Sequence, residues 1–328
     1  MSKNGLPRKP LTKRRLKNLI LNVLKNPFNM VVLVSLVILF CLIIIPLLTM
    51  IANTFTLAQG ELRRVQGHVG DFTLYYWKYI LTGTMSSAVL WGPLKNSFIC
   101  GFFTVLVSVP LGSVLAWLMI RTDIPGKKIL GLLVTVPYMI PSWTKALAWL
   151  AMFRNSTSGA DGFLAGMGIP IPDWLAYGPI AIVLCMSMHY YAFSYIMVSG
   201  ALRSINSELE EMGEIQGASK AQILRHITLP LILPSVLSAT VMTISKSIGT
   251  YGVPANLGNR IGYYTLATKM RNFIDQGPQA VGYAMSIVLV LLAALIIFSN
   301  QRIVGVRKSY ATVSGKGGRA TLMPLGKA

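Results

Sequence analysis

Six long apolar runs alternate with polar segments along this chain of 328 residues. Each run holds roughly 20 residues, which is the length that an α-helix needs to cross about 30 Å of hydrocarbon. The pattern therefore predicts an all-α fold, a polytopic membrane protein with about six transmembrane helices. The expected spans cover residues 30–52, 97–119, 129–153, 179–202, 231–251 and 281–300.

The composition agrees with a membrane protein and sets its orientation. Hydrophobic residues make up 53% of the chain and charged residues only 12%, whereas about a quarter of the residues in soluble domains are charged. With six spans, both ends of the chain share one side, and that side carries twenty of the 30 lysine and arginine residues. The positive-inside rule therefore predicts that the N- and C-termini are cytoplasmic.

Both ends of the chain are basic. Residues 1–28 place leucine, isoleucine and valine at helical spacing opposite lysine and arginine, which is typical of an amphipathic helix on anionic membrane lipid and not of an arm for nucleic acid. No cleavage site follows, so we interpret this segment as an anchor and not a removed signal peptide. Residues 303–328 are basic and glycine-rich, which predicts a flexible tail. The membrane domain then covers residues 29–302.

A polar segment between the fourth and fifth spans, residues 207–234, holds four of the chain's ten acidic residues. Ser207 with Glu210, and Ser219 with Gln222, have the spacing of capping boxes, which start helices. Gly217 stands between them and can end the first helix in the left-handed conformation. Pro230 is tolerated in the first turn of the next helix. The pattern predicts two short helices joined by a glycine, followed by a membrane helix.

The sequence of this segment resembles the cytoplasmic "EAA" loop of permease subunits of binding-protein-dependent ABC importers. The matching residues are Glu211-Met212-Gly213, Gly217-Ala218-Ser219, Ile227 to Pro230 and Pro234, although Met212 and Gly213 stand where two alanines are usual. The resemblance implies a type I importer permease whose loop, residues 203–230, inserts into a groove on the ATPase subunit. The residues it assigns to this coupling are Glu211, Gly217, Ala218, Ser219, Leu229 and Pro230. The alternative is a loop that only packs on its own domain.

Residues 245–270 resemble the iron(III), phosphonate and polyamine branch of these permeases. Gly249-Thr250, Gly252-Val253-Pro254 and Leu257-Gly258 carry the match, while Ser247 replaces a frequent acidic residue. The resemblance implies a translocation path for a small solute. Iron(III) or a phosphonate is the first expectation, and a polyamine or another small solute is the alternative. The segment supplies Gly249, Thr250 and Pro254 as candidate path residues.

Two lysines, Lys145 and Lys246, fall inside predicted spans. A charge near the bilayer centre costs roughly 2.5 to 3.5 kcal/mol, so such residues usually face water or protein. We expect them to line the path and to favour an anionic or chelated solute, unless each reaches an interface by its long side chain. Pro137 and Pro141 should kink the same third span, either for packing or for transport.

The sequence does not indicate that this chain catalyses a reaction. The three histidines are far apart, no Walker-type loop occurs, and the sequence suggests no catalytic residues, cofactor or metal. We therefore expect a non-enzyme whose energy comes from another chain. No Asp or Glu falls inside a predicted span, which argues against a secondary transporter. A membrane-embedded enzyme would need metal ligands or nucleophiles together at one membrane depth, and the sequence indicates no such group.

The resemblance also implies the surroundings of the chain. The expected partners are ABC ATPase subunits, a second permease subunit that is identical or related, a periplasmic or lipid-anchored solute-binding protein, and membrane lipid; nucleic acid is not among them. The expected location is the bacterial cytoplasmic (inner) membrane, which the chain crosses several times.

Overall fold

The computed structural model describes residues 27–61, 65–156, 159–205 and 208–307. Within these residues the chain is helical, apart from loops and one isolated antiparallel bridge between Thr56 and Phe72. The chain divides into two compact units, residues 1–73 and 74–328. Nearly all of the predicted amphipathic N-terminal segment, and the predicted tail beyond residue 307, lie outside the described residues.

The first unit is one apolar helix followed by a closed loop. The helix consists of α2 (Pro27–Leu39), a π-helical turn η1 (Phe40–Ile44) and α3 (Ile45–Asn53), and it is long and apolar enough to cross a membrane. The loop contains η2 (Gln59–Glu61), and the rings of Phe55 and Phe72 stack beside the bridge. The first predicted span is confirmed.

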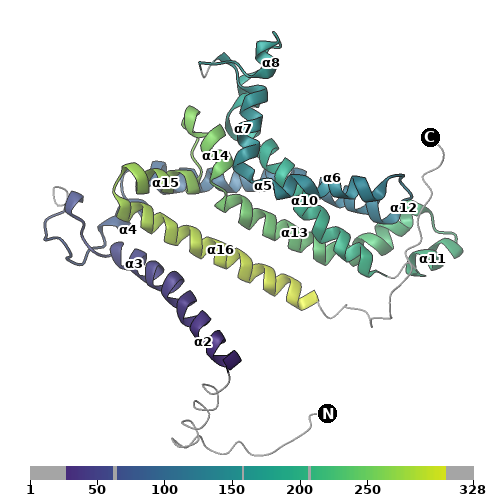
Figure 1. The fold of residues 1–328 in the computed structure, drawn as a ribbon, viewed down its shortest axis with the longest axis horizontal. Helices are drawn as coiled ribbons and strands as arrows, with labels where there is room; N and C mark the ends of the chain where they lie inside the picture. Colours follow the sequence, from purple (N-terminus) through teal and green to yellow (C-terminus); the bar gives the residue numbers. More distant parts are fainter. Residues whose placement is uncertain (1–26, 62–64, 157–158, 206–207, 308–328) are drawn as a thin grey trace, which may run out of the picture. The chain divides into compact units, whose positions relative to one another are not determined.

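Four long helices form the main bundle of the second unit. They are α5 (Gly92–Arg121), which follows the π-helical turn η3 (Ser87–Trp91), α10 (Gly178–Ser204), α13 (Leu229–Gly249) and α16 (Gln279–Arg307). Helix α10 packs along α5, α13 contacts both, and α16 lies beside α13 (Figure 1). Together with the first unit, five helices of the described chain are long and apolar enough to span a membrane.

The third predicted span is not one kinked helix but two short ones. Helix α6 (Lys127–Met139) ends where Ile140 takes an extended conformation, and α7 (Ser142–Phe153) begins after Pro141. Proline has no N–H to continue the helix, and it disfavours the helical conformation for the residue before it. Helix α6 lies along α10, whereas α7 turns away from it (Figure 1).

Short elements gather at the two ends of the second unit. At one end lie α4 (Tyr75–Leu81) and α15 (Leu266–Gln276), both against α16, and α14 (Gly252–Leu257) against α7. The short helices α8 (Phe163–Gly166), α9 (Asp173–Ala176) and η6 (Asn259–Ile261) complete this end. At the other end lie α11 (Glu208–Ile215), α12 (Lys220–Ile223) and the π-helical turn η5 (Leu224–Thr228) (Figure 1).

One glycine sets how closely α5 and α10 approach each other. A Cβ atom added at Gly112 would lie 2.3 Å from the carbonyl oxygen of Tyr191 and 2.7 Å from Cβ of Ser194. Small residues at helix crossings allow this contact between backbones, which is the usual way in which membrane helices gain packing. Gly112 is therefore required by the α5–α10 contact.

We predict that Gly112→Val lowers the thermal midpoint of the full chain in detergent, because an overpacked contact costs about 1–3 kcal/mol. Gly200→Ala on α10 is the matched control, since its added Cβ meets no atom within 4 Å. The control should keep or raise the midpoint. Equal midpoints for both variants and the unaltered chain would show that the α5–α10 distance does not depend on Gly112.

Candidate functional site

The polar segment between α10 and α13 folds largely as the pattern predicts. Gly217 ends the α11 region with φ +83°, in the left-handed conformation. Ser219 caps α12: its hydroxyl accepts a hydrogen bond from the Gln222 amide, and its own amide donates to the Gln222 side chain at 2.7 Å. The glycine junction and the second capping box are confirmed. Ser207, and with it the first predicted capping box, lies outside the described residues.

The junction with the fifth span differs from the prediction. Residues 220–249 form one continuous helical path through α12, η5 and α13, so no separate membrane helix starts at Pro230. The amide of Leu229 bonds to the carbonyl of Leu224, five residues earlier, as in a π-helix. Pro230 lies in the first turn after this π-helical segment, where it interrupts little. Helix α12 is therefore connected to α13 without a break in the helical path.

A buried ion pair fixes this segment to the end of α5. Nε of Arg121 lies 3.2 Å from Oε2 of Glu210, and their side chains are only 1% and 5% exposed. The other carboxylate oxygen of Glu210 accepts a hydrogen bond of 2.7 Å from the Thr228 hydroxyl. The guanidinium also donates to the Ile205 carbonyl at 3.4 Å. We call Arg121, Glu210 and Thr228 the buried tie; it joins α5, α11 and η5.

The tie divides the acidic residues of the segment into two groups. Glu210 faces inward, while Glu208 and Glu214 are exposed and Glu211 is half-buried on α11. Gly213 also faces inward, because its added Cβ would lie 3.1–3.2 Å from the side chains of Ile227 and Ile223. The absence of a larger residue at this position therefore lets α11 lie close to the α12–η5 path. The acidic outer face consists of Glu208, Glu211 and Glu214.

The remaining predicted coupling residues lie along the same path. Ala218 is half-buried, whereas Ser219, Leu229 and Pro230 are exposed. The structure thus brings Glu211, Gly217, Ala218 and Ser219 together around the α11–α12 junction. Leu229 and Pro230 lie farther along, at the start of α13.

The predicted path lysines meet a group of aromatic rings at the break between α6 and α7. Nζ of Lys145 on α7 contacts Nδ1 of His189, and Nζ of Lys246 on α13 lies 3.3 Å from the Tyr138 hydroxyl. The Tyr138 ring stacks on His189 with centroids 5.2 Å apart. Lys246 also lies over the Phe193 ring, 5.1 Å from its centroid. We call these five residues the cation–aromatic cluster.

Lys145 has a structural partner that explains part of its placement. Its ammonium donates a hydrogen bond to the Pro137 carbonyl. This carbonyl would normally accept from the amide of residue 141, but Pro141 has none. The lysine thus satisfies the acceptor that the helix break leaves open, as membrane proteins require of backbone groups away from water.

The other predicted path residues are placed differently from one another. Gly249 is exposed at the end of α13, and the Thr250 hydroxyl lies 2.7 Å from the Tyr190 hydroxyl. Pro254 is buried in α14 among core residues, and Ser247 is buried beside Gly101 of α5. The structure brings Gly249 and Thr250 within a turn of Lys246, whereas Pro254 lies in packed protein.

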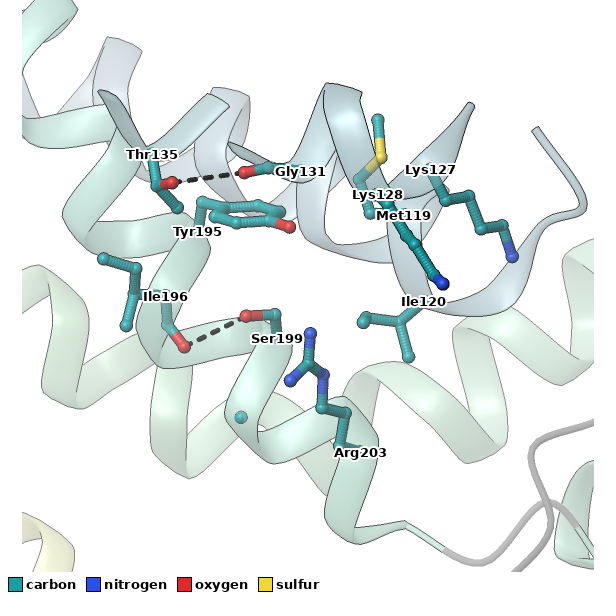
Figure 2. A pocket seen from close by; sticks show the side chains of 11 residues that line it. Met119, Ile120, Lys127, Lys128, Gly131, Thr135, Tyr195, Ile196, Ser199 and Arg203 are labelled. Carbon is teal, nitrogen blue, oxygen red and sulfur yellow. Dashed lines mark hydrogen bonds between the residues drawn. The ribbon is translucent and has the colours of Figure 1, made fainter. Parts of the chain in front are cut away.

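A pocket of about 500 Å³ lies between the end of α5, the start of α6 and the end of α10 (Figure 2). Three cations from two of these helices surround it: Lys127, Lys128 and Arg203. Its α5 wall includes Met119 and Ile120, which directly precede Arg121 of the buried tie. The pocket and the acidic outer face therefore lie at the same end of the second unit.

Sequence reasoning missed Arg121, Thr228, Tyr138 and Phe193. The available signal for Arg121 is an arginine at the very end of an apolar run, with an acid-rich polar segment elsewhere in the chain. That signal cannot select one of four glutamates, because the pairing depends on how α11 folds back on α5.

A bundle of long apolar helices with a capped helical loop at one end is an arrangement that suits a membrane permease. The chain belongs to the family described as binding-protein-dependent transport system inner membrane component, which it matches over residues 108–309. The match extends from the middle of α5 through α16 and includes the whole α11–α12 segment.

Relatives with similar sequences agree with this family. The chain is 25% identical over 227 residues to the sulfate transport system permease protein CysT of Salmonella typhimurium, covering 68% of this chain and 78% of that protein. It is 28% identical over 232 residues to the putative 2-aminoethylphosphonate transport system permease protein PhnV of the same organism, covering 71% and 80%. It spans only 59% of the probable sulfate permease cysT of Marchantia polymorpha, at 27% identity over 54% of this chain.

A bacterial ABC transporter involved in the import of the acidic polysaccharide alginate has a chain with the same fold. The TM-score is 0.65 at 17% identity, with 90% of this chain and 100% of that chain covered. The likeness confirms the predicted fold class, an all-α type I importer permease.

We predict that Lys145→Met lowers the thermal midpoint of the full chain more than Lys246→Met. Removing Lys145 leaves the half-buried Pro137 carbonyl without its donor, which costs up to about 1–3 kcal/mol. Lys246 is exposed, so its loss should change the midpoint little. Thermal unfolding in a neutral detergent compares the two; a larger loss in Lys246→Met would remove the structural role of Lys145.

Proposed function

We propose that this permease imports a small oxyanion of the phosphonate or sulfate type, and that it is driven by ATPase subunits docked on α11 and α12. The observation that carries the coupling part is the buried tie. It joins the docking segment to α5, while the continuous helical path of residues 220–249 joins it to α13. A loop that only packed on its own domain would need no exposed acidic outer face.

The docking surface is acidic on a strongly basic chain. The net charge is +20, yet Glu208, Glu211 and Glu214 share one short helix. A groove with basic groups on the ATPase would form charge-assisted hydrogen bonds with these carboxylates. Glu211 matches the glutamate of the EAA loop, so it is the first residue to test.

ATP binding would close the ATPase dimer and carry the α11–α12 segment with it. Because the segment is tied to α5 and continuous with α13, both membrane helices would follow. The path between them and the second permease subunit would then open toward a solute-loaded binding protein, and hydrolysis would reset it. The second subunit, the ATPase and the binding protein are parts of this proposal.

The solute class rests on charge. Lys145 and Lys246 place two cations in the cation–aromatic cluster, near the exposed Gly249 and the half-buried Thr250. Two cations beside a solute attract an anion and repel a polyamine. The names of the relatives give sulfate and 2-aminoethylphosphonate, which both contain an oxyanionic group, and they lend no support to the iron(III) expectation.

We predict that neutralising one member of the tie uncouples transport. Arg121→Gln or Glu210→Gln leaves one buried charge without its partner, which costs about 3–5 kcal/mol. The swap Arg121→Glu with Glu210→Arg should recover part of this loss. Solute uptake per ATP hydrolysed, measured on the assembled importer in proteoliposomes, should fall in the single variants and rise again in the swap.

Arg271 and Asp275 form a matched exposed control, with side chains 54% and 43% exposed and Nε 2.7 Å from Oδ2. Hydrogen bonding to Asp275 raises the pKa of Arg271. Arg271→Gln should leave uptake unchanged, because exposed pairs contribute about 0–1 kcal/mol.

The docking assignment is tested separately by Glu211→Lys and Gly217→Pro, which should both lose binding of the ATPase. Wild-type association and uptake in those two variants would refute the docking assignment.

We predict that Lys246→Met lowers uptake of sulfate or 2-aminoethylphosphonate, whereas Lys246→Arg retains it, because only the charge is needed. Labelled sulfate, 2-aminoethylphosphonate, iron(III) and putrescine are compared in cells that express the importer with its partners. ATP depletion at constant ion gradient should abolish uptake. Uptake of putrescine alone, or uptake that survives ATP depletion, would contradict the proposal.

A further inference from the structure

The pocket between α5, α6 and α10 gathers positive charge that the described protein does not neutralise. Lys127, Lys128 and Arg203 line it, and no carboxylate is among its lining residues (Figure 2). None of the three forms an ion pair with another described residue. Three cations around one cavity repel each other, and a bound anion would remove that cost.

The pocket also contains a hydroxyl that is available to a ligand. The Tyr195 side chain is only 5% exposed, its hydroxyl lies at the pocket, and it has no hydrogen-bond partner among the described residues (Figure 2). By contrast, Ser199 donates to the Ile196 carbonyl and Thr135 to carbonyls of its own helix. A buried phenol normally finds a partner. Tyr195 therefore supplies a free donor beside the cations.

Two glycines and a helix start keep the site open to an anion. A Cβ added at Gly131 would lie 3.4 Å from the Tyr195 hydroxyl, and one added at Gly200 would enter open space. Helix α6 begins at Lys127 after Gly126, which offers no side-chain cap to the first amides. These amides and the helix dipole favour negative charge at this end.

The walls of the pocket show what kind of anion fits. Met119, Ile120 and Ile196 form an apolar side of the pocket. A small inorganic ion would use the cations but not this apolar surface. A lipid headgroup uses both, since its phosphate meets the cations while its glycerol and first methylenes meet the isoleucines.

We infer that this pocket binds a phosphate-type oxyanion, and that its source is an anionic phospholipid headgroup. The site is separate from the cation–aromatic cluster and from the acidic outer face. The further statement that this lipid belongs to the cytoplasmic leaflet rests on the proposed function. Lipid bound here would hold the start of α6 against the ends of α5 and α10, next to the buried tie.

The test measures binding to the purified full chain in a neutral detergent, without ATPase or transport, so its outcome does not depend on the proposed function. The probes are dihexanoylphosphatidylglycerol, dihexanoylphosphatidylcholine and inorganic phosphate, each titrated while the thermal midpoint and the dissociation constant are recorded. Phosphatidylglycerol should bind and raise the midpoint, and phosphatidylcholine should bind more weakly. If inorganic phosphate binds as tightly as phosphatidylglycerol, the oxyanion site stands and its source is a free anion.

Variants separate this site from general surface charge. Changing Lys127, Lys128 and Arg203 together to Gln should weaken binding on the order of 100-fold. Tyr195→Phe and Gly200→Leu should weaken it without a change in charge, by removing the donor and by filling the cavity. The control changes Arg260, Lys269 and Arg271 to Gln, which removes the same charge at the other end of the unit.

The expected result is tight binding in the control and weak binding in the three pocket variants. Equal binding by the pocket triple and the unaltered chain would overturn the inference. So would an equal loss in the control triple, because binding would then follow net charge and not the pocket. Binding that is unaffected by both Tyr195→Phe and Gly200→Leu would likewise overturn it.

Discussion

The ion pair between Arg121 and Glu210 is the constraint on which the rest of this structure depends. Both side chains are almost fully buried, and a second carboxylate oxygen is held by Thr228. A buried pair adds little net stability compared with apolar packing, but the loss of either partner is costly. The pairing requires α11 to lie against the end of α5. The pair thus fixes the position of the α11–α12 segment more than it stabilises the fold.

The helices connected to this ion pair are in close contact or continuous with one another. Gly112 brings α5 against the backbone of α10, and the path of residues 220–249 runs from α12 into α13 without a break. The interruption between α6 and α7 has the opposite character. There Pro141 leaves a carbonyl open, and Lys145 satisfies it beside His189. One cation therefore serves both the helix break and the proposed path.

Local features were predictable from the sequence, whereas tertiary ones were not. Hydrophobic run length located the five long apolar helices of the described residues, and the chemistry of Gly217 and of Ser219 with Gln222 located the junction between α11 and α12. The split of the third span at Ile140 exceeded the predicted kink, and the helix continued past Pro230 through a π-helical turn. Arg121 and Glu210 lie far apart in sequence, so no periodicity records their pairing. Nor does hydropathy show which glutamate turns inward, since Glu210 and Glu211 are neighbours with different surroundings.

The most direct test of the account is a distance across the buried tie during the ATP cycle. Spin labels on cysteines placed at the exposed Asp123, just after α5, and Glu214, on α11, would report it in the assembled importer, with the native cysteines replaced. We predict a single distance that stays the same with and without ATP, because α11 and the end of α5 move as one body. A distance that changes when ATP binds, while Arg121 and Glu210 are intact, would contradict the account.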